Sequence, residues 1–335
     1  MKVYSRRVLQ LIPPLLLSFA WGVAACGSAD RKARAAEAQV DSHGRSDGSA
    51  AVASAAAQID SVNWASVDLA LGRKGQMQPG GVYKYAMPRS DLRVSSGGVQ
   101  IKPALSLGSW LAFKPKAGGA VALGDLVLTE KEYNRVITRL QQGGVGQTAV
   151  HKHLPEQSPA IWWTHVHAEG DPVKVAQTVK AALALTATPS QAPVPDASSV
   201  TPSQLDTAAI NQALGRSGKV SGGVYQVSIP RAERIQASGV EVPGSMGTAT
   251  ALNFQPTGGG KAAINGDFVM IADEVQSVIA ALRDNAIQVV TIHNHMLDEE
   301  PRLFFMHFWA NDDAVKLARG LRAALDRTNS ARARD

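Results

Sequence analysis

Short runs of alternating apolar and polar residues, separated by glycine and proline, recur along most of the chain and are typical of β-strands joined by turns. Residues 82–88 and 224–230 are two such runs, and each ends at a proline. Residues 130–142 and 274–285 instead carry apolar side chains at helical spacing, which predicts two amphipathic helices. A sheet combined with helices in this order predicts an α+β domain.

The same succession of elements occurs twice, at a constant offset of 142 residues. The dipeptide Gly124-Asp125 matches Gly266-Asp267 at this offset, and His165 matches His307. Chance does not hold one register over many identities, so the pattern indicates an internal duplication. The period is much longer than that of solenoid repeats. We therefore expect two tandem, pseudo-symmetric copies of one sheet-plus-helices domain.

Composition divides the chain into domains and connecting segments. Residues 26–57 and 187–203 are rich in small and polar residues and contain few large apolar side chains. Such segments cannot bury enough surface to offset the entropy of ordering them. We interpret 26–57 as a flexible tether and 187–203 as a Pro/Ala/Ser linker. The two repeat domains are then 58–186 and 204–328, followed by a disordered tail at 329–335.

The first 25 residues have the three parts of a secretory signal peptide. Basic residues precede a mostly apolar run, and the sequence VAAC that ends at Cys26 resembles a lipobox. Cys26 is the single cysteine of the chain and stands where a diacylglycerol would be attached. The apolar run is short for a transmembrane helix, and Pro13-Pro14 would break one. The sequence therefore predicts a signal peptide at 1–25 and an exported lipoprotein held on a membrane of the cell envelope; both the general secretory and the twin-arginine route stay open.

Net charge argues against a nucleic-acid partner. The chain has 34 Lys and Arg and 28 Asp and Glu, and three of the basic residues lie in the signal peptide. The mature chain therefore carries a net charge of about +3, which is too small to indicate nucleic-acid binding. We expect no nucleic-acid partner.

Six histidines occupy matching positions in the two copies and are the main candidates for chemistry. They are His151, His153 and His165 in the first copy and His293, His295 and His307 in the second. The first two of each set are two residues apart at the end of a predicted strand, so they share one face. Two imidazoles on one face, followed by a third, can bind zinc or another divalent metal and leave a position for water or substrate.

Two functions fit this pattern. In the first, the protein is a metal-dependent hydrolase or lyase, in which Glu299 or Glu300 of the loop before the third histidine acts as a general acid or base. In the second, the histidines make hydrogen bonds in a duplicated core. The protein would then bind a small-molecule ligand or an envelope partner without catalysis.

The spacing of the histidines sets one condition on a metal site. The loop residues predict which of the two copies binds metal more tightly. If the loop after His295 made a tight hairpin, His307 would lie about 10 Å along the ladder from His293, so a shared site needs a wide loop. The second copy is predicted to bind metal better, because it has three loop acids and has Asn294 where the first copy has Lys152. The Lys152 side chain is expected to point to the opposite face of its strand.

Two other features are given a structural interpretation. Arg89 and Arg231 follow strand-ending prolines and could clamp an anion, but the favoured interpretation is that both are exposed turn residues. The run 303–309 carries apolar residues on both strand faces. It fits either the wall of a small-ligand pocket or, as we favour, a central strand that is buried on both faces.

The segment from His293 to Ala310, HNHMLDEEPRLFFMHFWA, resembles the signature of the LppY/LpqO family of bacterial lipoproteins. The doubled architecture resembles the same family over about residues 58–328. This resemblance implies a surface lipoprotein with a tandem domain, and it implies no particular reaction. The first copy departs from the signature at Lys152, where the family has an asparagine. The His-x-His…His spacing is also similar, locally, to acetolactate decarboxylase and its relatives, a likeness that implies zinc.

Overall fold

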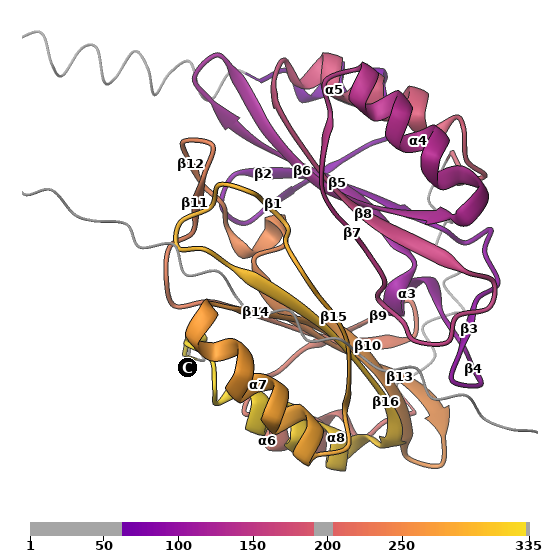
Figure 1. Ribbon diagram of the computed structural model, residues 1–335, viewed down its shortest axis with the longest axis vertical. Coiled ribbons are helices and arrows are strands. Elements are labelled where there is room, and N and C mark those ends of the chain that lie inside the picture. Colours follow the sequence, from indigo (N-terminus) through magenta and orange to yellow (C-terminus); the bar gives the residue numbers. More distant parts are fainter. Residues whose placement is uncertain (1–61, 191–203, 333–335) are drawn as a thin grey trace, which may run out of the picture. The chain divides into compact units, whose positions relative to one another are not determined.

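The computed structural model describes residues 62–190 and 204–332, and each predicted repeat forms one six-stranded antiparallel sheet with helices on one face (Figure 1). The strand order is β1-β2-β5-β6-β8-β7 in the first repeat and β9-β10-β13-β14-β16-β15 in the second, so both sheets have the same topology. The α+β class and the tandem duplication are therefore confirmed. The predicted signal peptide, Cys26 and the tether lie outside the described residues.

The elements of the two repeats follow the same order. Those of the first are α2 (Trp64–Leu71), β1 (Gln76–Gln78), β2 (Val82–Pro88), β3 (Ser95–Ser96), β4 (Val99–Gln100), α3 (Pro103–Ser106), β5 (Gly108–Lys116), β6 (Gly119–Thr129), α4 (Glu130–Gln142), β7 (Gly146–His151), β8 (Ile161–Gly170) and α5 (Pro172–Leu183). Those of the second are α6 (Thr207–Leu214), β9 (Lys219–Ser221), β10 (Val224–Pro230), β11 (Gln236–Ala237), β12 (Val240–Glu241), the short 3-10 helix η2 (Gly244–Met246), β13 (Ala249–Gly258), β14 (Lys261–Met270), α7 (Ala272–Asp284), β15 (Gln288–His293), β16 (Phe304–Asp313) and α8 (Ala314–Leu325). Among these described helices, none has both the length and the apolarity to cross a bilayer.

Local signals in the sequence fix the starts of the long helices. The Glu132 carboxylate accepts a hydrogen bond of 2.8 Å from the Thr129 backbone N–H at the start of α4, as in a capping box. Glu274 accepts the matching bond of 2.9 Å from the Ile271 N–H at the start of α7. The helices predicted at 130–142 and 274–285 therefore appear within two residues of the expected bounds.

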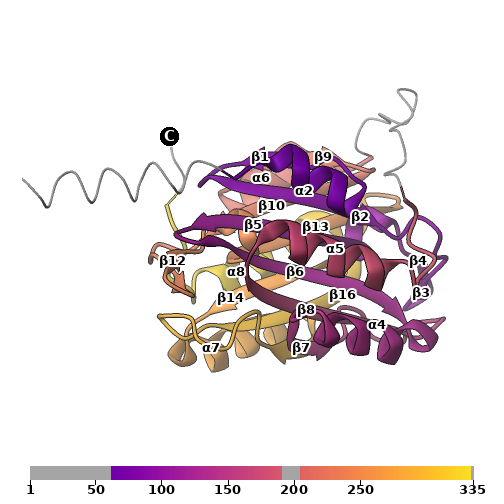
Figure 2. The same ribbon diagram turned by 90° about the horizontal axis from the view of Figure 1, so that it is seen from above.

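Helices cover one face of each sheet, and the other faces of the two sheets pack against each other (Figures 1 and 2). In the second repeat, Met306 and Phe308 of β16 belong to the core beneath the helices. Phe305 of the same strand packs in a cluster that includes Leu123 of the first repeat, and Trp309 packs in another that includes Trp163. The favoured interpretation of 303–309 as a strand buried on both faces is thus confirmed.

Arg89 and Arg231 are buried, so the favoured interpretation of exposed turn residues is wrong. Arg89 Nη1 donates to the carbonyl oxygen of Val127 at 2.7 Å and to Glu132 at 2.9 Å, and its other nitrogens bind Asp91. Arg231 makes the same contacts with Val269, Glu274 and Glu233. Each long side chain reaches from the turn to the first turn of the next long helix and fills the place of a core residue. The two networks therefore tie turn, sheet and helix together.

The end of the second repeat is paired with the sheet rather than free. The Ala331 N–H donates to the Pro230 carbonyl oxygen at 2.9 Å, and the Ala232 N–H donates to the Asn329 carbonyl oxygen at 2.9 Å. Asn329 also donates to the carboxylate of Glu274 from its backbone N–H at 2.7 Å. The disordered tail predicted from residue 329 is therefore wrong for 329–332, whose backbone groups find partners at the end of β10.

Candidate metal centre

Two aspartate–histidine pairs lie on the central strands, on the faces that the two sheets turn toward each other. Asp125 on β6 is the ladder partner of His165 on β8, and Asp267 on β14 is the ladder partner of His307 on β16. Ladder partners in an antiparallel sheet place their side chains on one face. All four residues are buried. Neither aspartate is predicted from the sequence as a site residue, although the Gly-Asp dipeptide repeated inside an apolar strand is the signal that could identify it.

The glycine before each aspartate allows a close approach of the strands. A Cβ atom on Gly124 would lie 2.7 Å from a backbone carbonyl oxygen of the neighbouring strand, and one on Gly266 would lie 1.8 Å from the matching oxygen. The carbonyl oxygens of the two glycines then meet the third histidines: His165 Nδ1 lies 3.3 Å from Gly124 and His307 Nδ1 lies 2.6 Å from Gly266. Because a carbonyl oxygen only accepts, each ring carries its proton on Nδ1. The Nε2 lone pair is left free for a metal.

The His-x-His pairs lie where β7 and β15 end. In the first repeat, His151 Nε2 and His153 Nε2 are 2.9 Å apart, and His153 Nε2 is 3.3 Å from Asp125 Oδ2. In the second repeat, His295 Nε2 is 3.0 Å from Asp267 Oδ2. Two histidines and one aspartate of the same repeat therefore point their ligand atoms into one small volume.

The third histidine of each repeat lies against the His-x-His pair of the other repeat. The ring centroids of His153 and His307 are 3.7 Å apart, and those of His165 and His295 are 3.8 Å apart. His165 Nε2 lies 3.3 Å from His293 Nε2. Each repeat thus completes the constellation of its partner repeat.

We define two sites that are related by the pseudo-two-fold symmetry of the repeats. Site A consists of Asp125, His151, His153 and His307, and site B consists of Asp267, His293, His295 and His165. Three groups of residues place their ligand atoms within 4.8 Å of one another: His151, His153 and His307; His151, His165 and His293; and Asp267, His293 and His295. The middle group links the sites, because the His151 and His293 rings stack at 3.9 Å between centroids.

The structure brings all six predicted histidines together but groups them differently from the expected sets. His307 joins the His-x-His pair of the first repeat, and His165 joins that of the second. The loop between β15 and β16 is wide, as a metal site requires. His293 pairs with Phe305 and His307 pairs with Thr291, so the rings of the two histidines are 4.7 Å apart rather than about 10 Å.

Burial lowers the pKa values of five histidines of the cluster and so keeps these five neutral. It lowers the pKa of His165 and of His295 to about 3, and nearby histidines contribute to both shifts. The pKa values of His151, His153 and His293 are also held well below the usual value, first by burial and then by neighbouring imidazoles. A neutral imidazole has a free lone pair, so these rings are ready to bind a metal at neutral pH.

The two aspartates interact electrostatically across the cluster. Burial, with a smaller contribution from the charge of Asp125, raises the pKa of Asp267 to about 6 against the opposing effect of His307. Two carboxylates that share a buried site without a cation repel each other. A divalent ion would remove this repulsion.

Several buried polar atoms of the cluster have no hydrogen-bond partner. They are His295 Nε2, His307 Nε2, Asp125 Oδ1, Asp267 Oδ1, and the Nδ1 atoms of His151 and His293. His295 Nε2 has none even though Asp267 Oδ2 is 3.0 Å away, because the geometry is not that of a hydrogen bond. An unpartnered buried polar atom costs about 1–3 kcal/mol, a cost that coordination of a metal would remove at the Nε2 atoms. The two Nδ1 atoms have no partner among the described residues.

The predicted general acids and bases lie away from the ligand atoms. Glu299 is buried, and its carboxylate accepts a hydrogen bond of 2.9 Å from the Leu303 N–H and one of 3.3 Å from Arg302. Glu300 is exposed. Lys152 points away from site A, as expected, and its Nζ lies 4.8 Å from the centroid of the Trp162 ring. The two grounds for ranking the second copy above the first therefore find no support in the geometry.

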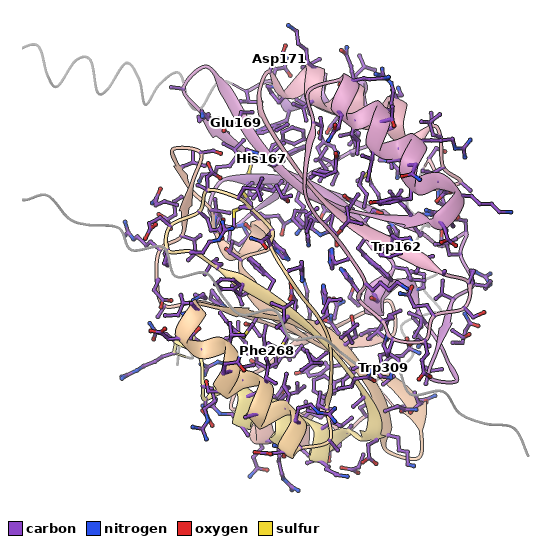
Figure 3. All side chains as sticks on the ribbon, in the orientation of Figure 1. Trp162, His167, Glu169, Asp171, Phe268 and Trp309 are labelled. Carbon is purple, nitrogen blue, oxygen red and sulfur yellow. The ribbon has the colours of Figure 1, made fainter. Side chains whose placement is uncertain are left out.

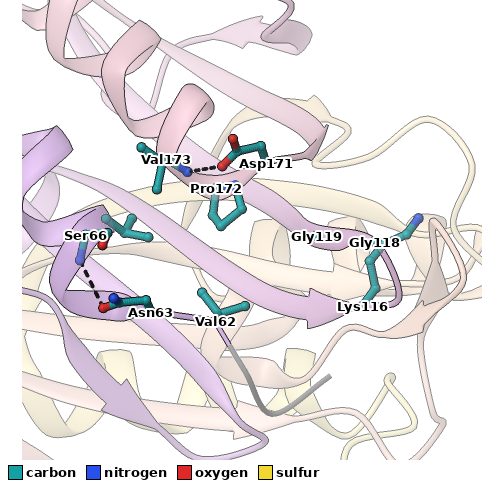
Figure 4. Close-up of a pocket in the computed structure, with 10 residues that line it drawn as sticks. Val62, Asn63, Ser66, Lys116, Gly118, Gly119, Asp171, Pro172 and Val173 are labelled. Carbon is teal, nitrogen blue, oxygen red and sulfur yellow. Dashed lines mark hydrogen bonds between the residues drawn. The ribbon is translucent and has the colours of Figure 1, made fainter. Parts of the chain in front are cut away.

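Other polar features are separate from the cluster. His167 lies two residues after His165 on β8, and its Nε2 pairs with Ser238 Oγ at 3.0 Å (Figure 3). A cavity of about 480 Å³ lies where the β5–β6 turn meets the start of α5 and is lined by Lys116, Gly118 and Asp171 among others (Figure 4). Its lining contains none of the six matched histidines.

Comparisons with solved structures find weak similarities. Three solved structures, two of them of trimeric microcompartment shell proteins, are similar to the chain at low identity. The double-ringed trimeric shell protein MSM0271 is 15% identical, with 63% of this chain and 84% of that chain covered and a TM-score of 0.19. The trimeric shell protein PduB is 11% identical, with 74% and 88% covered and a TM-score of 0.17, and EtuB from Clostridium kluyveri is 8% identical, with 75% and 90% covered and a TM-score of 0.16. Scores this low carry no argument about fold or function.

A search of curated proteins finds no match to the chain. A family model described as Domain of Unknown Function (DUF1259) matches it twice, at residues 65–185 and 208–327. The two matches fall on the two sheets and leave the linker between them unmatched. The chain therefore belongs to the DUF1259 family and carries two tandem copies of its domain.

Proposed function

We propose that this protein is an exported, lipid-anchored metal-binding protein that holds two divalent ions, with zinc as the first candidate, between its two repeats. One observation carries the proposal: six histidines and two aspartates converge, four pairs of their ligand atoms lie 2.9–3.3 Å apart, and several of these buried atoms have no hydrogen-bond partner. A tetrahedral zinc ion with bonds of about 2.0–2.1 Å separates its ligand atoms by about 3.3 Å. The spacing of these four pairs is therefore close to that of ligands around one zinc ion.

The donor set fits zinc or a metal of similar softness. Each site offers three imidazole nitrogens and one carboxylate oxygen, and neutral imidazole suits zinc, copper, nickel and iron. The backbone carbonyls of Gly124, Gly266 and Gly247 hold His165, His307 and His295 by their Nδ1 atoms. Such outer contacts orient the rings and aim Nε2 at the ion.

The geometry supports binding better than hydrolysis or lysis. A catalytic zinc keeps three protein ligands and one open position, whereas each site here has a fourth buried candidate ligand beside a group of three, Asp125 at site A and His165 at site B. The hydrolase or lyase predicted from the sequence would require one ligand to leave. The acid or base role predicted for Glu299 would also require its carboxylate to release the Leu303 N–H.

Metal analysis of the purified full chain tests the proposal. We expect two zinc ions per chain after dialysis against zinc, and X-ray absorption at the zinc edge should fit three nitrogen ligands and one oxygen ligand at about 2.0–2.1 Å. Replacement of His167, which lies outside both sites, should leave the count at two. A count of zero would contradict the proposal and would favour the alternative, a metal-free binding lipoprotein whose histidines are structural.

The membrane partner rests on the sequence, which places a lone cysteine after a lipobox-like segment and resembles the LppY/LpqO lipoproteins. Cys26→Ser should abolish fatty-acid labelling and move the protein from the membrane fraction to the soluble fraction. Equal labelling of the variant and the parent would contradict the lipid anchor. The metal sites do not depend on this result.

A further inference from the structure

Lys84 on β2 and Gln226 on β10 occupy matching positions in the two repeats and make the same contact. Lys84 Nζ donates to the carbonyl oxygen of Ser245 at 2.9 Å, and Gln226 Nε2 donates to that of Ala104 at 2.8 Å. Each side chain therefore reaches from its own sheet to a backbone carbonyl of the other repeat. The two residues have one structural role, and only Lys84 brings a charge.

A continuous set of contacts links Lys84 to site B. Its Nζ lies 4.1 Å from the centroid of the Trp110 ring. A Cβ atom on Gly247 would lie 3.2 Å from that ring and 3.2 Å from His295 Nδ1, so Trp110 and His295 flank this glycine. His295 Nδ1 also pairs with the Gly247 carbonyl oxygen at 2.9 Å. The Trp110 ring and Gly247 therefore lie between the Lys84 ammonium group and His295.

Site A has no equivalent of this cation. Gln226 takes the place of Lys84, and Ala251 takes the place of Trp110, since Ala251 pairs with Asp267 as Trp110 pairs with Asp125. A divalent ion in either site is compensated by one aspartate. An ion in site B would also lie near the partly buried Lys84 ammonium group, across Trp110 and Gly247, where charges are weakly screened.

We infer that the two sites bind metal unequally, with site A filling first and site B filling second because Lys84 repels the ion there. This inference rests on the proposed function. Burial already lowers the pKa of Lys84 to about 8. An ion in site B therefore either faces the charged ammonium or displaces its proton, and both cost binding free energy. The ion in site B is the exchangeable one, which reverses the ranking expected from the loop acids.

A zinc titration of the metal-free full chain, with a competing chelator to set the affinity scale, tests the inference. We expect two binding steps, with the second dissociation constant at least about ten-fold higher than the first. Lys84→Gln should bring the two constants within about three-fold of each other, because glutamine keeps the contact with Ser245 as Gln226 keeps its own. Gln226→Lys should weaken the first step by at least about ten-fold.

Single-site variants identify the steps. His153→Ala should leave only the weak step, and His295→Ala should leave only the strong one, a comparison that holds even if Lys84→Gln does not fold. Two equal steps in the parent chain, or a Lys84→Gln chain that binds two ions with an unchanged ratio, would overturn the inference and leave the proposed function intact. A chain that binds no zinc would overturn both.

Discussion

The two repeats share a backbone plan and four matching site residues each, but they differ in the residues that surround the sites. The sheets have the same strand order, and the ring distances within the cluster repeat closely, at 4.8 and 4.7 Å for the matching pairs His151–His165 and His293–His307. Around them, His167 in the first repeat corresponds to Trp309 in the second, which packs in the apolar core between the sheets. Lys84 corresponds to Gln226.

This difference separates two kinds of position. The candidate metal ligands are all identical at the constant offset. Some surrounding residues differ and find other partners, such as Ser238 for His167 and the Trp162 ring for Lys152. The proposed ligand set was therefore duplicated as a unit, and each proposed site needs a histidine from the other repeat. The comparison therefore predicts that loss of each equivalent ligand costs one bound ion, and that the surrounding residues have unequal effects on affinity.

The largest effect is expected from the two stacked histidines at the centre. His151→Ala combined with His293→Ala removes one ligand from each site, so the zinc content should fall from two ions to none. Thermal stability in zinc should fall too, because a site held at 100 times its dissociation constant adds about 2.7 kcal/mol. Differential scanning fluorimetry with and without chelator measures this loss. If zinc still stabilised the double variant, the assignment of His151 and His293 as ligands of the two sites would be contradicted.

The exchange of ligands between repeats predicts how paired substitutions combine. His307→Ala with His153→Ala should leave one ion, because both residues belong to site A. His307→Ala with His295→Ala should leave none, because the two residues serve different sites although both lie in the second repeat. Mass spectrometry under native conditions counts the ions. One remaining ion in the second pair would show that the site is built within a single repeat.

The buried arginines should give equal effects in the two repeats. Arg89→Met leaves Glu132 and Asp91 without their cation, and Arg231→Met does the same to the matching acids. Breaking a buried ion pair on one side costs about 3–5 kcal/mol. Urea unfolding should show losses of this size, equal within about 1 kcal/mol, whereas exposed Arg93→Ala should cost less than about 0.5 kcal/mol. A large loss in one repeat alone would indicate that only one network carries stability.

A smaller and graded effect is expected from pH. The folded protein keeps His165 and His295 neutral down to about pH 3, whereas the unfolded chain binds protons at these residues below about pH 6.5. The metal-free protein should therefore lose stability as pH falls through this window, by about 1.4 kcal/mol per pH unit for each such histidine. Asp267 acts in the opposite sense below about pH 6, because its raised pKa makes the folded state take up a proton first. The urea midpoint, measured from pH 7 to 4, reports the net of these two opposing effects on stability. A midpoint that does not change with pH would contradict neutral, buried histidines.

Much of the fold is predictable from the sequence because local signals agree with tertiary ones. The strand at 82–88 alternates and ends at Pro88, and β2 has these bounds. The helix at 130–142 begins where Glu132 caps the backbone. The sequence-based prediction for Arg89 is wrong because a position after a turn suggests exposure. The residue is buried by pairing with Glu132, which lies 43 residues further along the chain. Long-range pairing of this kind leaves no mark in local periodicity.

The candidate site is predictable in its residues but not in its grouping. The constant offset identifies the six histidines, because identical residues in register stand out from a diverged background. The offset does not tell whether His307 shares a site with His293 or with His151, because that grouping depends on how the two sheets pack. Asp125 and Asp267 are not predicted as site residues because each lies in an apolar strand, where a single acidic residue resembles the end of the strand. Their role becomes visible only beside His153 and His295.

Anomalous diffraction at the zinc absorption edge, from crystals of the zinc-loaded protein, tests the central claim most directly. We predict two peaks, one bounded by His151, His153, Asp125 and His307 and the other by His293, His295, Asp267 and His165. Each ion would then take ligands from both repeats, at about 2.0–2.1 Å. A single peak enclosed by His293, His295 and His307, or no peak in the cluster at all, would contradict the account.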